Sequence, residues 1–157
     1  MRAMRPDEAE AVVGMVGDLA LSIPAPLPKL TAQTLRDETA GDNALLDCVV
    51  AEDATGLAGC CVTVLIFSTW RNLRGIYISD IYVKPERRKD GLGQKLLEAS
   101  IRRGAERGAK FVKLEADVGN AGAIAFYDRL GFTLKPDERL YILEAEATER
   151  LLSQVER

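Results

Sequence analysis

The stretch from Ile78 to Leu97, ISDIYVKPERRKDGLGQKLL, constrains the fold of this chain more than any other part of it. Apolar residues of strand character end at a basic turn that contains Pro85, two glycines follow at positions 91 and 93, and a helix with regularly spaced leucines comes next. Glycines at the start of a helix let backbone N–H groups approach a negatively charged ligand, and the helix dipole favours that charge. The stretch therefore predicts a phosphate-type anion site between a strand and a helix.

Three apolar runs of strand character lead up to the basic turn, and short polar turns join them. The runs cover residues 45–52, 57–67 and 75–83, and the first turn ends at Gly56. Such runs form an antiparallel meander, whereas a Rossmann dinucleotide site needs a parallel βαβ unit and a third glycine, where this chain has Leu96. The P-loop pattern GxxxxGK[ST] is also absent, so the sequence argues against an NAD or ATP site.

The rest of the chain alternates between helical and strand periodicity, without repeats or linkers. Apolar residues at intervals of three and four predict helices, alternation of apolar and charged residues predicts a half-exposed strand, and clustered prolines predict an extended loop. This order predicts one α+β domain over residues 1–157, in which helices flank a mostly antiparallel sheet. The predicted segments are helices over 6–20, 34–40, 91–107, 121–130 and 145–155, a loop over 22–30, and strands over 110–116 and 140–143.

The composition excludes several classes of function. The chain contains no histidine, which removes serine–histidine and cysteine–histidine catalysis and most zinc sites, and we expect no bound metal. Its net charge of −3 gives no electrostatic reason to bind nucleic acid, and no apolar run approaches the ~20 residues that span a membrane. The three cysteines, Cys48, Cys60 and Cys61, lie in apolar strand segments without disulfide or metal spacing, which predicts buried thiols and a cytoplasmic location.

Two motifs, in a fixed order with a strand between them, give the most specific evidence about function. The first is Arg88-x-x-Gly91-x-Gly93, and the second is NAGAIAFYDRLGF, from Asn120 to Phe132. Together they resemble the pyrophosphate-binding motif and the N-x-x-A-x-x-F-Y-x-x-x-G-F segment of the GNAT superfamily of N-acetyltransferases. The resemblance implies acetyl-CoA as co-substrate, a GNAT-like sheet with a splayed strand pair that binds it, and a homodimer.

The resemblance also implies roles for individual residues on the acetyl-CoA side. The strand backbone at 81–83 pairs with the pantetheine arm, Asn120 binds the same arm, and Tyr127 lies near the sulfur. A tyrosine suits protonation of the leaving thiolate, because its pKa of about 10 exceeds the ~8.5 of a cysteine-like thiol. Structural alternatives stay open, since Tyr127 can pack against the sheet and Asn120 can cap the following helix. The implied cofactor-binding residues are Ile81, Tyr82, Val83, Arg88, Lys89, Asp90, Gly91, Leu92, Gly93, Gln94, Asn120 and Tyr127.

On the acceptor side, FSTWRNLRGIYISDIYV is most similar to the spermidine/spermine and thialysine acetyltransferase branch of the superfamily. Ser79 stands where those relatives usually carry a glutamate proposed to take the amine proton through water, and Asp80 keeps the neighbouring carboxylate. We expect Asp80 to bind the ammonium group or relay its proton, with Trp70 and Ser79 beside the substrate. Two alternatives remain: Asp80 in an ion pair with Arg71 or Arg74, and Trp70 packed within its turn.

These features predict an N-acetyltransferase that moves an acetyl group to a primary amine of a small molecule by direct attack, with Asp80 and Tyr127 as catalytic residues. Polyamines, amino acids and thialysine-like compounds are the candidate acceptors. The first alternative is a non-catalytic module that binds or senses acyl-CoA, which Ser79 would favour. The second is an acetyltransferase of protein lysines or N-termini, whose basic acceptors would suit an acidic chain.

Overall fold

The computed structural model describes residues 1–155. Its contacts divide the chain into two compact units, the first from Met1 to Asn120 and the second from Ala121 onward. Among the described residues, no helix is both long enough and apolar enough to cross a membrane.

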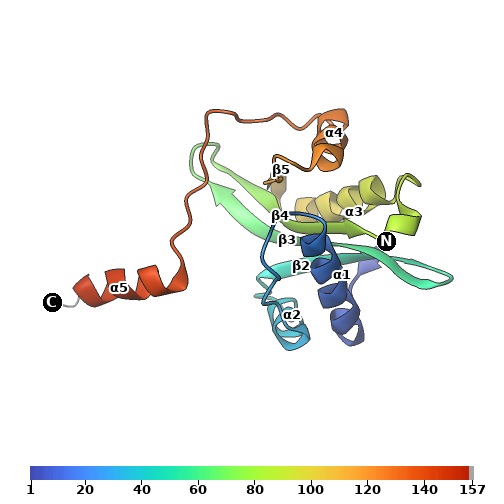
Figure 1. Ribbon diagram of the computed structural model, residues 1–157, viewed down its shortest axis with the longest axis horizontal. Helices are drawn as coiled ribbons and strands as arrows, with labels where there is room; N and C mark the ends of the chain where they lie inside the picture. Colours follow the sequence, from blue (N-terminus) through green and yellow to red (C-terminus); the bar gives the residue numbers. More distant parts are fainter. Residues whose placement is uncertain (156–157) are drawn as a thin grey trace. The chain divides into compact units, whose positions relative to one another are not determined.

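A five-stranded sheet forms the centre of the first unit, with the strand order β1-β2-β3-β4-β5 (Figure 1). Strands β1 to β4 pair antiparallel in sequence order, and β5 pairs parallel to β4. The predicted antiparallel meander is confirmed, and the sheet as a whole is mostly antiparallel. The strands are β1 (Arg2–Ala3), β2 (Leu46–Asp53), β3 (Gly56–Ser68), β4 (Leu73–Val83) and β5 (Ala109–Leu114).

Helices cover both faces of this sheet, because successive side chains of a strand point to opposite faces. Cys60 of β3 belongs to a buried cluster with Val12 and Leu35, which come from helices α1 and α2. The next residue, Cys61, points to the other face and meets Ser100 of helix α3. These elements are α1 (Ala9–Leu21), α2 (Ala32–Glu38) and α3 (Leu92–Glu106), with the short 3-10 turns η1 (Pro6–Glu8) and η2 (Pro85–Arg87).

All three cysteines are buried and free, as the sequence predicts. Burial raises the pKa of the Cys48 and Cys61 thiols to about 12 and that of Cys60 well above its usual value. The thiols are therefore neutral near pH 7 and act as packing groups in the core.

An ion cluster fixes β1 to the start of α1 and to β2. The carboxylate of Glu8, which is 8% exposed, accepts hydrogen bonds from Arg2 at 2.6 and 2.8 Å and from Arg5 at 2.8 Å. Arg2 also donates to Glu52 of β2. The Arg2 and Arg5 guanidinium groups lower the pKa of Glu8 to about 2. The cluster thus holds in place a strand that is only two residues long.

When η1 and α1 are counted together as the first predicted helix, the predicted helix and strand boundaries agree with the structure to within two residues, except for the strand predicted over 140–143. The short second helix, for example, begins at Ala32 because the Thr31 side chain accepts a hydrogen bond from the Thr34 N–H at 3.1 Å and caps the helix there. Gly108, with φ of +86°, follows the C-terminal end of α3 as predicted.

The second unit contains helices α4 (Ala121–Arg129) and α5 (Ala145–Val155). The Tyr127 ring lies edge-on to the rings of Phe126 and Phe132, at centroid distances of 5.3 and 5.4 Å. Gly131, with φ of +84°, follows α4 and marks the predicted end of this helix.

The predicted strand over residues 140–143 is wrong. The described chain forms no strand there, and the side chains from Leu140 to Leu143 are 57% to 83% exposed. Apolar residues of this type favour an extended backbone, but a strand also requires a neighbouring strand that completes its hydrogen bonds. The local sequence favours the extended backbone, but it does not show whether a neighbouring strand is present.

Candidate active site

Strands β4 and β5 separate at the segment that the sequence assigns to acetyl-CoA. β5 pairs with β4 only from Arg74 to Ile78, whereas β4 continues to Val83. β3 pairs with β4 along this stretch as well. One edge of residues 79–83 is therefore hydrogen-bonded to β3, whereas β5 does not pair with the other edge. An extended, amide-bearing molecule can pair with such an edge like an added strand. The predicted residues Ile81, Tyr82 and Val83 all lie in this segment.

A β-bulge stands at the beginning of the same segment. Ile78 lies opposite Thr63 and Asp80 lies opposite Val62, so Ser79 is an extra residue on β4. A bulge of this kind bends the strand and re-aims the side chains beside it. The two predicted acceptor-side residues, Ser79 and Asp80, are therefore placed by the bulge, with Ser79 exposed and Asp80 half-buried.

Asp80 faces the side of the sheet that α1 covers, because its cross-strand neighbour Val62 belongs to the core beneath α1. Burial raises the pKa of the Asp80 carboxyl above its ordinary value. Tyr77 lies nearby, and its pKa is raised by burial and by the negative charges of Glu115 and Asp80. Asp80 and Glu115 are thus the acidic groups near this part of the sheet, and a positively charged amine beside Asp80 would favour its ionised form.

The two arginines proposed as structural partners of Asp80 are engaged elsewhere. The Arg71 guanidinium lies 5.4 Å from the centroid of the Phe111 ring, and Arg74 donates to the Arg107 carbonyl at 3.1 Å. Within residues 1–155, Asp80 forms no ion pair. The alternative ion pair between Asp80 and Arg71 or Arg74 is therefore not formed in the structure.

The N-terminus of α3 has the geometry of an anion site. Gly91 occupies the N-cap position with φ of +72°, and no side chain caps the helix there. The first helical hydrogen bond runs from the Lys95 N–H to the Gly91 carbonyl at 3.1 Å. The N–H groups of the first turn, at positions 92–94, precede this bond and are the ones a helix directs toward a negatively charged ligand.

The three cations of the basic turn have different surroundings. Arg87 pairs with Asp53 and also lies 3.7 Å from Asp90. Arg88 donates to the Val83 carbonyl at 3.0 Å and lies 5.8 Å from the centroid of the Tyr82 ring. Lys89 is exposed and forms no ion pair with the described residues. Lys89 also has φ of +75°, a left-handed backbone conformation that is energetically unfavourable for residues other than glycine.

Tyr82 links β4 to α1 through a residue that the sequence analysis missed. Its side chain is 5% exposed, and its hydroxyl donates to Asp18 at 3.5 Å. Burial and the Asp18 carboxylate raise the pKa of Tyr82. Asp18 belongs to no motif and is exposed on α1, so no signal in the sequence identifies it.

The remaining predicted residues lie in three separate places. Trp70, in the β3–β4 turn, is 98% exposed, so it does not pack within the turn. Asn120 directly precedes α4, and its N–H donates to the Asp117 carbonyl at 3.0 Å. Tyr127 belongs to the second unit, where it contacts the aromatic rings described above.

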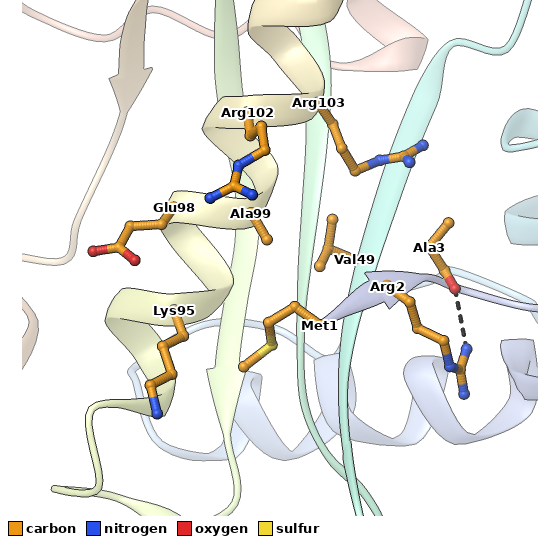
Figure 2. Close-up of a pocket in the computed structure, with 9 residues that line it drawn as sticks. All are labelled: Met1, Arg2, Ala3, Val49, Lys95, Glu98, Ala99, Arg102 and Arg103. Atoms are coloured by element: carbon orange, nitrogen blue, oxygen red, sulfur yellow. Dashed lines mark hydrogen bonds between the residues drawn. The ribbon is translucent and has the colours of Figure 1, made fainter.

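A hollow of about 420 Å³ lies at the opposite edge of the sheet, between β1, β2 and α3 (Figure 2). Two of its arginines already have carboxylate partners, because Arg2 pairs with Glu8 and Arg103 with Asp47. The predicted site residues are not among those that line it, so we do not assign it to the active site. Groups of three or more metal-binding side chains are likewise absent from the described residues.

Comparison with protein families decides where this arrangement belongs. The model of the acetyltransferase (GNAT) family matches residues 13–132, which include both sequence motifs and the separating strands. The chain belongs to the GNAT acetyltransferase family. The resemblance that the two motifs carry is thus confirmed.

Two curated relatives show the range of acceptors among proteins similar to this GNAT chain. Thialysine N-epsilon-acetyltransferase of Sus scrofa is 32% identical over 111 residues, which cover 66% of this chain and 65% of the relative. N-alpha-acetyltransferase 30 of Schizosaccharomyces pombe is 43% identical over 60 residues, which cover 38% of this chain and 39% of that protein. The match thus spans about 65% of the thialysine enzyme's length.

A solved structure supports the fold of this GNAT protein. A crystal structure of a mutant protein from Bacillus halodurans has a TM-score of 0.75 at 22% identity and covers 90% of this chain and 98% of its own. At this identity the likeness shows the fold alone. It agrees with the α+β architecture expected from the sequence.

Proposed function

We propose that this GNAT protein transfers the acetyl group of acetyl-CoA to a primary amine of a small molecule. The observation that carries the proposal is Asp80, a half-buried carboxylate without a basic partner among the described residues, next to the edge of β4 that β5 leaves. A positively charged amine would supply the partner that the fold does not. The thialysine enzyme of Sus scrofa supports a small acceptor with a primary amine, such as a polyamine, an amino acid or a thialysine-like compound.

The residues of β4 and α3 fit acetyl-CoA as the donor. The backbone at Ile81, Tyr82 and Val83 would pair with the amides of the pantetheine arm. The first-turn N–H groups of α3, together with the Lys89 ammonium, would hold the pyrophosphate. A side chain at position 91 would meet no neighbouring atom within 4 Å, but φ of +72° favours glycine there, so the glycine serves the backbone conformation.

The proposed chemistry divides between a carboxylate, a backbone amide and a tyrosine. Acetyl-CoA supplies an activated acetyl group as a thioester. Asp80 binds the ammonium of the acceptor and passes its proton to water, so that the neutral nitrogen forms the new N–C bond. A backbone N–H near Tyr82 donates to the carbonyl oxygen as negative charge develops, and Tyr127 gives a proton to the sulfur when the C–S bond breaks. The roles of Tyr127 and of Asn120 in binding the pantetheine arm rest on the family resemblance.

A protein acceptor is the second candidate, because N-alpha-acetyltransferase 30 of Schizosaccharomyces pombe matches 60 residues of this chain. Ser79, in place of the usual glutamate, favours a third possibility, a module that binds acyl-CoA without turnover. The proposal for a small amine differs from both in its expected product. We further propose a homodimer, from the family resemblance, and a cytoplasmic location, from the three free and buried thiols.

Mass-spectrometric detection of acetylated products tests the proposed function. The protein is incubated with acetyl-CoA and a panel of polyamines, free amino acids, thialysine and basic peptides. The proposal expects one added acetyl group on a small amine and a lower kcat/KM for Asp80→Asn, while Asp42→Asn, which removes an exposed carboxylate, serves as the control. Acetylated peptides alone would favour the protein acceptor, and acetyl-CoA binding without any product would favour the sensing module.

A further inference from the structure

Asp53 connects the turn between β2 and β3 to the loop between β4 and α3. One of its carboxylate oxygens accepts hydrogen bonds from the N–H and the hydroxyl of Thr55, at 2.7 and 2.6 Å. The other oxygen is buried, and its ionic partner is the Arg87 guanidinium. The side chains of Asp53 and Arg87 are 21% and 34% exposed, so the pair is partly shielded from solvent.

Arg87 lies at the beginning of the loop that would hold the pyrophosphate. The loop leaves β4 beside the start of β3, where the Lys84 N–H donates to the Ala58 carbonyl at 3.0 Å (Figure 1). The Arg87 N–H then donates to the Lys84 carbonyl at 2.9 Å and closes the η2 turn. Lys89 and Gly91, both with positive φ, follow within four residues and lead into the first turn of α3. A side chain that fixes Arg87 therefore fixes the start of this backbone path.

We propose that Asp53 is a positioning residue for the pyrophosphate site: by holding Arg87, it keeps the loop from Lys84 to Gly91 in the conformation that binds the donor. The inference rests on the proposed function, because it requires a CoA-type ligand at the N-terminus of α3. Asp53 itself does not touch the ligand. Its effect passes through the Arg87 ion pair and the backbone that follows it.

The sign of the effect separates positioning from simple electrostatics. A carboxylate close to an anion site repels the ligand, so its removal alone would strengthen CoA binding. Positioning predicts the reverse, because a released loop must be ordered again when the ligand binds. Ordering the backbone of about one residue corresponds to roughly a tenfold loss of affinity.

Calorimetric titration with CoA measures this sign on the intact chain. We expect Asp53→Asn and Arg87→Gln each to bind CoA about tenfold more weakly than the wild type, and the double variant to bind no more weakly than either. Asparagine keeps the oxygen that accepts from Thr55, so the β2–β3 turn is retained, and Arg87→Gln breaks the pair without changing the turn. Asp42→Asn, which removes an equal charge from an exposed site, is the matched control.

A donor without the pyrophosphate supplies the readout that a merely structural role would not give. Turnover with S-acetyl-pantetheine should be the same for Asp53→Asn and the wild type, while KM for acetyl-CoA rises. Unchanged or tighter CoA binding, or equal losses with both donors, would overturn the inference. Wild-type protein that fails to bind CoA would instead overturn the proposed function, and the inference with it.

Discussion

Lys89 offers a direct test of the backbone conformation at the proposed donor site. Its φ of +75° is one of two positive values among the described residues other than glycine, the other being +51° at Asn72. A left-handed conformation costs a residue with a Cβ about 1–2 kcal/mol, and glycine avoids this cost. Glycine also loses about 0.5–1 kcal/mol more conformational entropy on folding than alanine does. Lys89→Gly should therefore be more stable than Lys89→Ala by about 0.5–1 kcal/mol.

Thermal unfolding of the two variants checks this difference. For a chain of this size, 1 kcal/mol corresponds to about 2–4 °C in Tm, so Lys89→Gly should unfold roughly 1–4 °C above Lys89→Ala. Both variants lose the same ammonium group, so charge cancels in the comparison. The same pair of substitutions at Asn72, whose φ is also positive, is the comparison in a turn outside the donor site, and the glycine variant should again be the more stable of the two. Equal Tm values for the two Lys89 variants would refute the left-handed conformation.

The Lys89 charge has a separate consequence for the donor. Acetyl-CoA should bind more weakly to both variants than to the wild type, and the affinity should depend less on salt, because an exposed cation opposite the pyrophosphate has been removed. Calorimetric titration at two salt concentrations measures both effects. An unchanged salt dependence would mean that the Lys89 ammonium does not contact the donor.

Three further predictions follow from the surrounding structure. Glu8→Gln should lower the free energy of unfolding at pH 7 by about 1–2 kcal/mol, after allowance for the exposed arginines, and the difference should disappear between about pH 5 and pH 2, because the pKa of Glu8 falls from 4.5 to about 2 on folding. Urea unfolding measures it, with Glu149→Gln as control, because Glu149 is exposed and forms no ion pair with the described residues. Asp80→Asn should raise stability at pH 7 while kcat/KM falls, because burial raises the pKa of Asp80 and disfavours its ionised form in the folded state. Gly59→Ala would place a methyl group 2.5 Å from the Tyr82 carbonyl oxygen, so it should cost about 1–3 kcal/mol in thermal unfolding and raise the KM for acetyl-CoA.

The strand–loop–helix stretch is predictable because its determinants are local. Pro85 stops the strand, and Gly91 permits the positive φ at the N-cap, so the boundary of β4 and the start of α3 are written in neighbouring residues. The bulge at Ser79 has no such signal. It depends on the register between β3 and β4, which at the bulge pairs residues 15 and 18 positions apart, and no glycine marks it. The exact placement of Asp80 therefore follows only from the structure.

The basic turn shows a second limit of local reasoning. In the sequence, Arg87, Arg88 and Lys89 are three equivalent cations beside a glycine-containing loop. In the structure, Arg87 forms an ion pair with Asp53, Arg88 donates a hydrogen bond to the Val83 carbonyl, and Lys89 is exposed. The partner of Arg87 comes from a turn more than thirty residues earlier, brought close by the β3–β4 pairing. Which cation can meet an anion is thus decided by tertiary structure.

This division explains why the donor is easier to infer than the acceptor in a chain without histidine. Backbone groups on the edge of β4 and at the first turn of α3 account for most of the proposed donor site. Their backbone conformations require glycine and proline, which can be recognised in the sequence. The proposed acceptor site depends on side chains at Trp70, Ser79 and Asp80, whose positions are set by a turn and a bulge. Substitutions at these three side chains would change the proposed acceptor site and leave both sequence motifs intact.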